Sequence, residues 1–156
     1  MKLTKEIKLK SWGPGEWVDE PDFLEFEHAG LKCLVIRVTA QEMNGSLFGG
    51  HLCGYVEFKH TVPEDPFALP FDVHGGITFG EELKELNCYA VGFDCAHLND
   101  VIPSIEFVFP SKEFNSAPDK YKYLIEKIYK NIGFVESETR SLAEQVSKYD
   151  KEKLNG

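Results

Sequence analysis

The apolar pattern of this chain changes character once, and that change constrains the fold more than any other feature. Over residues 12–110, short apolar segments separated by turn residues predict strands. From Pro118 onward, apolar residues recur at steps of three and four, which predicts two amphipathic helices over residues 118–150. Strands first and helices last favour an α+β fold, with an antiparallel or mixed sheet core followed by the two helices.

The sheet core divides into strands and loops at clusters of Gly and Pro. Strands are predicted over residues 23–27, 31–38, 51–58, 73–79 and 88–93, and a short edge strand over residues 1–10. The His28-Ala29-Gly30 stretch predicts a hairpin turn between the first two strands of the core. Loops are predicted over residues 39–50, 61–70 and 103–117.

The two C-terminal helices are expected to meet near Gly133. Pro118 and Asp119 suit the first turn of a helix, and Gly133 is a natural stop. The second helix has one apolar face, formed by Val135, Thr139, Leu142, Val146 and Tyr149. Apolar faces on both helices predict packing against the sheet, or a homo-oligomer that forms through them.

Length, charge and cysteine usage bound the class of protein. The 156 residues suit one domain. A formal net charge of −9 argues against a nucleic-acid polymer or an anionic membrane as partner. No apolar run approaches the roughly 20 residues of a membrane span, and no signal peptide is apparent, so we expect a cytoplasmic protein. The four cysteines are then expected to be thiols, and their wide spacing does not fit a zinc knuckle.

Two polar clusters interrupt the apolar segments. Asp72-Val73-His74-Gly75-Gly76 is followed by Gly92-Phe93-Asp94-Cys95-Ala96-His97, with Asp100 close behind. A core built only for packing would not contain so many polar groups, because a buried polar group costs free energy unless it is paired. The clusters therefore predict a site, and their two imidazoles are expected to meet across neighbouring strands.

The first cluster suggests how its imidazole would be oriented. On an extended strand, Asp72 and His74 point to the same face, where the carboxylate could fix the tautomer of the imidazole. The pair Gly75 and Gly76 leaves backbone bare for the close approach of a ligand, or else forms a bulge.

The second cluster leaves several chemistries open. His74, His97 and Asp94 could bind a divalent metal with Asp100 in reserve, since imidazole and carboxylate suit zinc and similar ions. Cys95 could be a nucleophile activated by a histidine, or a small buried apolar residue. The two histidines could instead be general acid and base, or donors to a polar ligand. In the last alternative, these groups only satisfy one another in the core.

Arg37 lies inside an otherwise apolar strand. A guanidinium there is costly unless paired, so it is expected to meet a carboxylate such as Asp72 or Asp94, or else a ligand phosphate, with the internal partner favoured. The other histidines, His28, His51 and His60, have no informative spacing and are expected on the surface or in turns. No phosphate-binding loop, nucleophile elbow or dinucleotide fingerprint occurs in the sequence, so the enzyme classes that depend on them have no support.

Several stretches together resemble a family of small, largely uncharacterised proteins of tailed phages and prophages. They are Glu16-Trp17-Val18-Asp19-Glu20-Pro21-Asp22, Leu31-Lys32-Cys33-Leu34-Val35-Ile36-Arg37, His51-Leu52-Cys53-Gly54-Tyr55-Val56, Asp72-Val73-His74-Gly75-Gly76-Ile77-Thr78-Phe79, Gly92-Phe93-Asp94-Cys95-Ala96-His97 and Leu142-Ala143-Glu144-Gln145-Val146. The family often has a Gly-His-Pro turn after the Gly-Tyr-Val strand, where this chain has Val62-Pro63-Glu64-Asp65-Pro66.

The resemblance implies a phage accessory protein that acts in the host bacterial cytoplasm. By analogy with proteins that counter host defence, we expect it to bind a small polar or nucleotide-derived molecule, with Arg37, Asp72, Gly75, Gly76 and Cys95 around the ligand. One alternative is a hydrolase that cleaves such a molecule through its histidines and Asp94, with or without a divalent metal. Another is an inhibitor of a host protein that uses the acidic segment 16–27 and the C-terminal helices.

Overall fold

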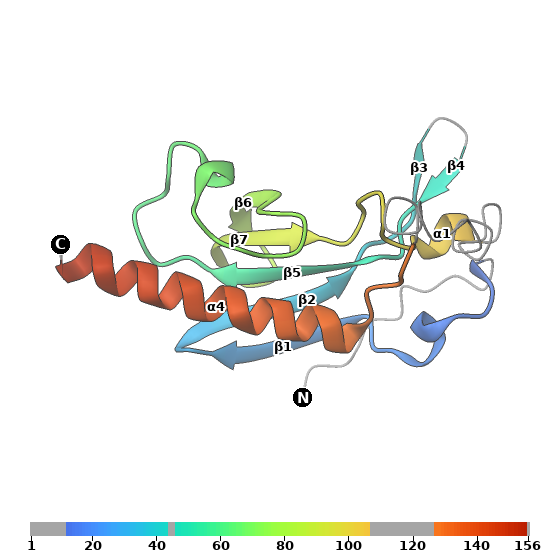
Figure 1. Ribbon diagram of the computed structural model, residues 1–156, viewed down its shortest axis with the longest axis horizontal. Helices are drawn as coiled ribbons and strands as arrows, with labels where there is room; N and C mark the ends of the chain where they lie inside the picture. Colours follow the sequence, from blue (N-terminus) through green and yellow to red (C-terminus); the bar gives the residue numbers. More distant parts are fainter. Residues whose placement is uncertain (1–11, 44–45, 107–126, 156) are drawn as a thin grey trace, which may run out of the picture.

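Five strands form one antiparallel sheet in the computed structural model, which describes residues 12–43, 46–106 and 127–155 (Figure 1). In spatial order they are β1 (Phe23–His28), β2 (Leu31–Arg37), β5 (Leu52–Glu57), β7 (Cys88–Asp94) and β6 (Phe79–Leu83). A long C-terminal helix, α4 (Ile132–Asn155), accompanies the sheet. The α+β fold expected from the sequence is confirmed.

The β1–β2 hairpin forms where the sequence predicted it. Its turn residues Ala29 and Gly30 both have positive φ, at 53° and 77°, which is the backbone that a two-residue hairpin turn requires. The register pairs Phe23 with Ile36 and His28 with Leu31. This register places Arg37 just beyond the last pair, at the end of β2.

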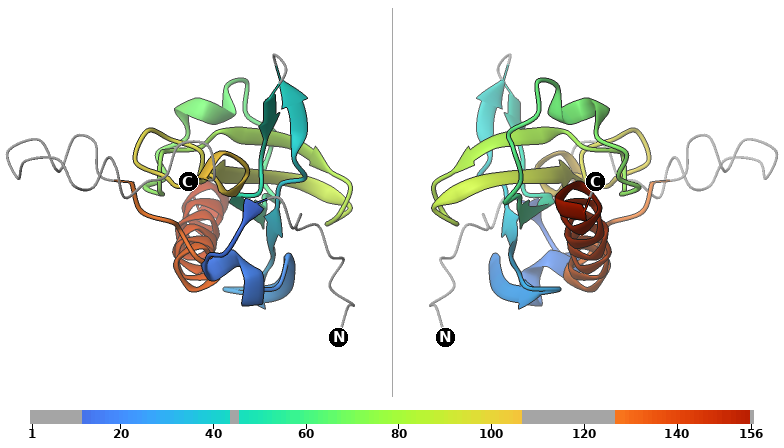
Figure 2. Two further views of the ribbon diagram at one scale, coloured as in Figure 1. Left: turned by 90° about the vertical axis from the view of Figure 1, so that its right-hand side faces the viewer. Right: turned by 90° about the vertical axis from the view of Figure 1, so that its left-hand side faces the viewer.

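Helix α4 packs against one face of the sheet, on β5, β2 and β1, and its C-terminal turns extend past the ends of these strands (Figures 1 and 2). Val135, Leu142 and Val146 of its apolar stripe are fully buried, as the helical spacing predicted, whereas Tyr149 is only partly buried. Gly54 on β5 allows this close approach, because a Cβ there would lie 2.3 Å from Thr139 Oγ1. Because Gly54 has no side chain, the helix can pack closely on β5 at this position.

The first predicted C-terminal helix is only partly within the described residues. Residues 118–126 lie outside them, and residues 127–131 are not helical. The sequence suggested that Gly133 ends a helix. In the structure, it lies instead in the first turn of α4. The side chain of Asn131 accepts the N–H of Phe134 at 2.9 Å, which is the bond that an N-cap residue makes. The Asn131 cap therefore starts α4 just before the glycine.

Two further expectations about the sheet core are wrong. Residues 73–78 form a turn and irregular backbone, and β6 begins only at Phe79. The predicted loop 39–50 contains a small hairpin, β3 (Gln41–Met43) and β4 (Ser46–Phe48). Asn44-Gly45 between these strands is a sequence signal for such a hairpin.

The remaining described elements are short. They are η2 (Glu16–Asp19), η3 (Pro66–Ala68) and α1 (Pro103–Glu106). The predicted edge strand over residues 1–10 lies outside the described residues. Among the helices that the structure describes, none is both long and apolar enough to cross a lipid bilayer.

Candidate functional site

A tight turn follows β7 and fixes the second polar cluster. The N–H of His97 donates to Asp100 Oδ2 at 3.0 Å, and the N–H of Asp100 donates to the His97 carbonyl at 2.9 Å. At the end of β7, Asp94 accepts the Ala96 N–H and the Thr78 hydroxyl at 3.0 and 2.8 Å. These bonds hold both carboxylates and the His97 backbone in place.

The first cluster lies on a loop that α4 holds. Glu138 accepts the N–H of His74 at 3.0 Å. Two helical turns further along, Gln145 accepts the N–H of Asp72 and donates to its carbonyl, at 2.7 and 2.8 Å. Because α4 pins the loop backbone at two places, the His74 ring has a defined position.

The two glycines make the turn that follows His74. Gly75 and Gly76 have φ values of 70° and 80°, a left-handed backbone that other residues adopt only with strain. The Gly76 N–H donates to the Val73 carbonyl at 2.8 Å and closes the turn. A Cβ on Gly75 would lie 2.0 Å from His97 Nε2, so this glycine also makes room for the imidazole of the second cluster.

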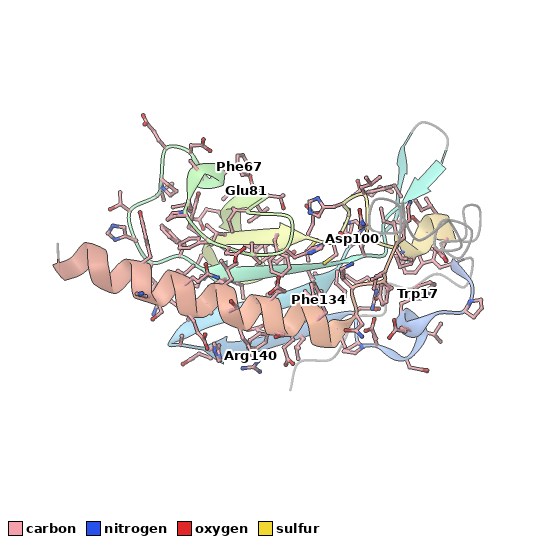
Figure 3. All side chains as sticks on the ribbon, viewed as in Figure 1. Trp17, Phe67, Glu81, Asp100, Phe134 and Arg140 are labelled. Atoms are coloured by element: carbon pink, nitrogen blue, oxygen red, sulfur yellow. The ribbon has the colours of Figure 1, made fainter. Side chains whose placement is uncertain are left out.

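The two clusters meet at Asp100. Nε2 of His74 lies 2.9 and 3.0 Å from the two Asp100 carboxylate oxygens. The ring centroids of His74 and His97 are 5.5 Å apart with an interplanar angle of 70°, and Phe134 packs edge-on against His74 at 5.4 Å. Figure 3 places Asp100 beyond the end of β7 and Phe134 near the start of α4. The imidazoles thus come together from two loops rather than from neighbouring strands.

Asp100 is held ionised by its surroundings. Its side chain is fully buried, and burial alone would raise its pKa. Hydrogen bonds from His74, the His97 N–H and Lys130 outweigh burial and lower the pKa of Asp100 below its usual value. Lys130 Nζ lies 3.1 Å from Oδ1 of Asp100. The carboxylate is therefore a fixed negative charge at the centre of the cluster.

His97 is the member of the cluster whose hydrogen bonding is incomplete. Its Nε2 is buried and has no aligned hydrogen-bond partner in the part of the chain that the structure describes. Asp94 Oδ1 lies 3.3 Å from this nitrogen but does not form a well-aligned bond with it. A buried nitrogen without a partner costs free energy, and a bound group could recover that cost. We call His74, His97 and Asp100, with Asp94 and Lys130 beside them, the histidine site.

Asp72 does not have the role that the sequence suggested. Because residues 73–78 are not extended, Asp72 and His74 do not share the face of a strand. Asp72 is exposed, and across the described ranges no hydrogen bond joins it to His74. The carboxylate that orients His74 is Asp100.

Arg37 has internal partners, but not the two carboxylates named from the sequence. Its Nε donates to Asp22 at 2.7 Å, and Nη2 lies 3.2 Å from Glu20. Its Nη1 donates to the Gly50 carbonyl and the Tyr129 hydroxyl at 2.8 and 2.9 Å. Neither Asp72 nor Asp94 pairs with it among the described residues. We call Arg37, Asp22, Glu20 and Tyr129 the arginine cluster, and it buries the guanidinium among partners from within the chain.

Cys95 is poorly placed for nucleophilic chemistry. It is buried among core residues, and burial raises the pKa of its thiol far above the ordinary value. Burial likewise raises the pKa of Cys53 to about 12. All four cysteines are unbridged thiols, as expected. The thiol of Cys95 therefore fits the alternative of a small buried apolar residue.

Two residues of this region were not identified as part of it from the sequence. The sequence predicts His51 on the surface or in a turn, but the residue is only 5% exposed, and burial lowers its pKa. Its Nδ1 also has no hydrogen-bond partner within the described residues. Lys130 gave no local signal, because it reaches Asp100 from a segment thirty positions further along the chain.

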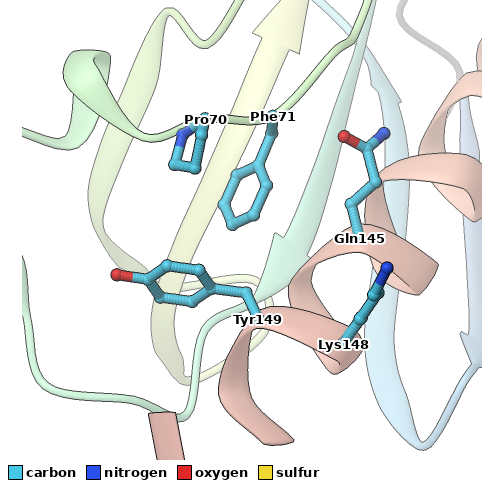
Figure 4. A pocket seen from close by; sticks show the side chains of 5 residues that line it. All are labelled: Pro70, Phe71, Gln145, Lys148 and Tyr149. Atoms are coloured by element: carbon cyan, nitrogen blue, oxygen red, sulfur yellow. The ribbon is translucent and has the colours of Figure 1, made fainter. Parts of the chain in front are cut away.

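One hollow lies elsewhere on the molecule, between the loop before Asp72 and α4 (Figure 4). It encloses about 190 Å³ and is lined by Pro70, Phe71, Gln145, Lys148 and Tyr149. The lining is mostly apolar and contains no member of the histidine site.

Comparisons with known protein families, with curated proteins and with solved structures find no match to this chain. Function is therefore inferred from the chemistry of the site itself. The site offers imidazole nitrogens for proton transfer or metal ligation, a fixed carboxylate and an ammonium group.

Proposed function

We propose that this protein binds a small polar molecule at the histidine site. The observation that carries the proposal is the buried Nε2 of His97, which has no aligned partner within the described residues and lies beside the bare backbone of Gly75. The neighbouring polar groups of His74, Asp94 and Asp100 have hydrogen bonds within the chain. A ligand with a polar atom could complete the cluster.

The resemblance to phage proteins suggests the kind of ligand. A phage accessory protein that counters host defence in the bacterial cytoplasm would meet nucleotide-derived signals. The nucleobase and ribose edges of such a signal offer the hydrogen-bond groups that imidazole and Lys130 can recognise. This assignment of ligand class rests on the resemblance, whereas the position of the site rests on the geometry.

A capture experiment tests the proposal. The purified protein would be incubated with a cyclic dinucleotide, a cyclic trinucleotide and ADP-ribose, and then washed and heat-denatured. We expect one of these probes to be recovered in stoichiometric amount and to raise the melting temperature. His97→Ala should lose both effects, and His60→Ala, a matched change outside the site, should keep them. Recovery of no probe, together with no thermal shift, would count against the proposal.

The paired contact between His74 and Asp100 favours hydrolysis as the second candidate. A carboxylate on Nε2 fixes the tautomer and leaves Nδ1 of His74 as a proton acceptor, which is the arrangement of a general base. His97 would then be the acid. The state of the recovered probe separates the two functions, because capture leaves it intact and hydrolysis alters it. If His74→Ala and His97→Ala both leave turnover unchanged, the acid–base mechanism is wrong.

Inhibition of a host protein has less support from the contacts. Of the acidic segment 16–27, Glu20 and Asp22 are engaged with Arg37 inside the chain. Helix α4 packs on β2 and β5, and Val135, Leu142 and Val146 of its apolar stripe are already buried within one chain. A homo-oligomer stays a prediction, and it would have to form through a surface other than the apolar stripe of α4.

A further inference from the structure

We propose that the histidine site holds a divalent transition-metal ion with the character of Zn²⁺, bound by His74, His97 and Asp100. This inference deepens the proposed function, since it names a cation as part of the same site. Two imidazoles and one carboxylate form a donor set that zinc and related first-row ions favour. Mg²⁺ and Ca²⁺ prefer sites made of oxygen atoms. Three protein ligands would leave a fourth position for a water or a ligand atom.

The distances among the donor atoms suit such an ion. One donor atom from each of the three residues lies within 4.8 Å of the other two. Ligands about 2.0–2.1 Å from a tetrahedral ion are about 3.3 Å from one another. His74 Nε2 and Asp100 Oδ2 are 2.9 Å apart, so they need to separate only slightly. The largest adjustment is a closer approach of His97, whose side chain is 35% exposed and can move.

His97 also supplies an independent sign of a missing partner. Its Nε2 is buried and has no aligned hydrogen bond among the described residues. The Asp94 carboxylate 3.3 Å away is itself fixed by Ala96 and Thr78. Because Asp94 lies beside the same nitrogen, it does not orient the ring through the opposite nitrogen, but it adds a negative charge next to the proposed ion.

The local charge favours a cation over an anion. Asp94 and Asp100 contribute two negative charges and Lys130 one positive charge, on a chain whose formal net charge is −9. Lys130 contacts Oδ1 of Asp100, which leaves Oδ2 on the side of His74 and the His97 backbone. A phosphate-bearing ligand would be repelled by this site unless a cation accompanied it. A bound cation would therefore allow a negatively charged site to bind a nucleotide-derived ligand.

Metal titration of the purified full-length chain tests the inference. After treatment with a chelator and its removal, Zn²⁺ would be titrated by calorimetry, and Co²⁺ by its visible absorption, which reports nitrogen and oxygen ligands. We expect one ion per chain. His74→Ala and His97→Ala should each weaken binding by about a hundredfold or more, and Asp94→Asn by about tenfold.

Matched variants keep the test decisive. His28→Ala and His60→Ala remove imidazoles outside the histidine site and should change the affinity less than twofold. Circular dichroism would show whether each variant is folded. If His74→Ala unfolds, His97→Ala alone decides, because its ring makes no aligned hydrogen bond in the described structure. Absence of Zn²⁺ binding, or binding that both site variants leave unchanged, would overturn the inference.

The capture experiment, repeated with and without chelator, separates this inference from the proposed function. Zn²⁺ binding without capture of any probe would leave the metal site standing and refute the ligand proposal. Capture of a probe by chelator-treated protein that does not bind Zn²⁺ would refute the metal site and leave the ligand proposal standing.

Discussion

The arginine cluster and the histidine site are two ionic groups in one small domain, and they differ in completeness. One short segment joins them, because Tyr129 reaches Arg37 and the next residue, Lys130, reaches Asp100. In the arginine cluster, Arg37 donates to four groups, and Glu20 accepts from the Tyr129 hydroxyl at 2.5 Å and from the Ile132 N–H at 2.6 Å. In the histidine site, His97 Nε2 has no aligned partner among the described residues.

This difference distinguishes a structural cluster from the site that we propose binds a ligand. A buried charge network that satisfies all its own groups needs nothing from outside and joins the segments that it connects. The arginine cluster links η2, the end of β2 and the start of α4 in this way. An incomplete network retains an energetic cost that a ligand or an ion can remove. The comparison predicts large stability effects from the first cluster and small ones from the second.

Removal of Arg37 should give the largest effect. Arg37→Met would leave Asp22 and Glu20 buried without their cation, which costs about 3–5 kcal/mol of unfolding free energy. Arg140→Met is the control, since Arg140 is 39% exposed and its ion pair with Glu136 is worth about 1 kcal/mol or less. Urea unfolding would measure both. Equal losses in the two variants would mean that the arginine cluster is not structurally special.

The glycine pair offers the next largest effect. Gly75→Ala and Gly76→Ala both place a Cβ at positive φ, which costs about 1–2 kcal/mol. Only the Cβ at Gly75 also meets the His97 ring, since nothing lies within 4 Å of a Cβ at Gly76. Gly75→Ala should therefore be the less stable variant and should shift the His97 imidazole signals in an NMR spectrum. If the two variants match in both measurements, the packing of His97 against Gly75 is wrong.

The histidines themselves should separate stability from binding. His97→Ala should cost less than about 1 kcal/mol, because its ring makes no aligned hydrogen bond in the described structure. His74→Ala should cost about 1–3 kcal/mol, since it removes one of the three donors to the buried Asp100 carboxylate. Thermal and urea unfolding would give both values. A larger cost for His97→Ala would place that residue among the structural groups.

The sequence predicted those parts of the molecule that local patterns determine. The β1–β2 hairpin, the β5 and β7 strands and the apolar stripe of α4 follow from turn residues and periodicity within short windows. The β3–β4 hairpin was not predicted, because the Asn and Gly residues of the segment 39–50 also fit a flexible loop. The strand predicted over residues 73–79 was wrong because the backbone of 72–74 is held by α4, through side chains more than sixty positions away.

The partners within the site depend on the same long separations. Residue types predicted that imidazoles, carboxylates and Arg37 would need partners, but not which ones. Asp100 replaces Asp72 as the partner of His74, from 26 positions away. Glu20 and Tyr129 are 109 positions apart. Only the tertiary fold brings such residues together, so a single sequence without structural information leaves the pairing open.

Substitution of His51 should have the smallest effect on stability. The pKa of His51 depends on residues of both clusters. It is buried, and burial lowers its pKa below the ordinary 6.5. Asp94 and Asp100 act against this shift, whereas Arg37 and His97 act with it. The folded state therefore binds this proton less readily than the unfolded state does. The stability that depends on a neutral His51 is complete above pH 6.5 and is lost as the pH falls through 6.5 toward the folded-state pKa.

Urea unfolding between about pH 7.5 and pH 5 would measure this dependence. The unfolding free energy of the unmodified protein should fall more steeply toward low pH than that of His51→Gln, which has no group to protonate at this position. Parallel curves for the two proteins would show that His51 is not held neutral. If bound Zn²⁺ places a further positive charge near His51, its pKa should fall further, because a nearby cation disfavours the imidazolium. The difference between the two curves should then extend to lower pH in the metal-loaded protein.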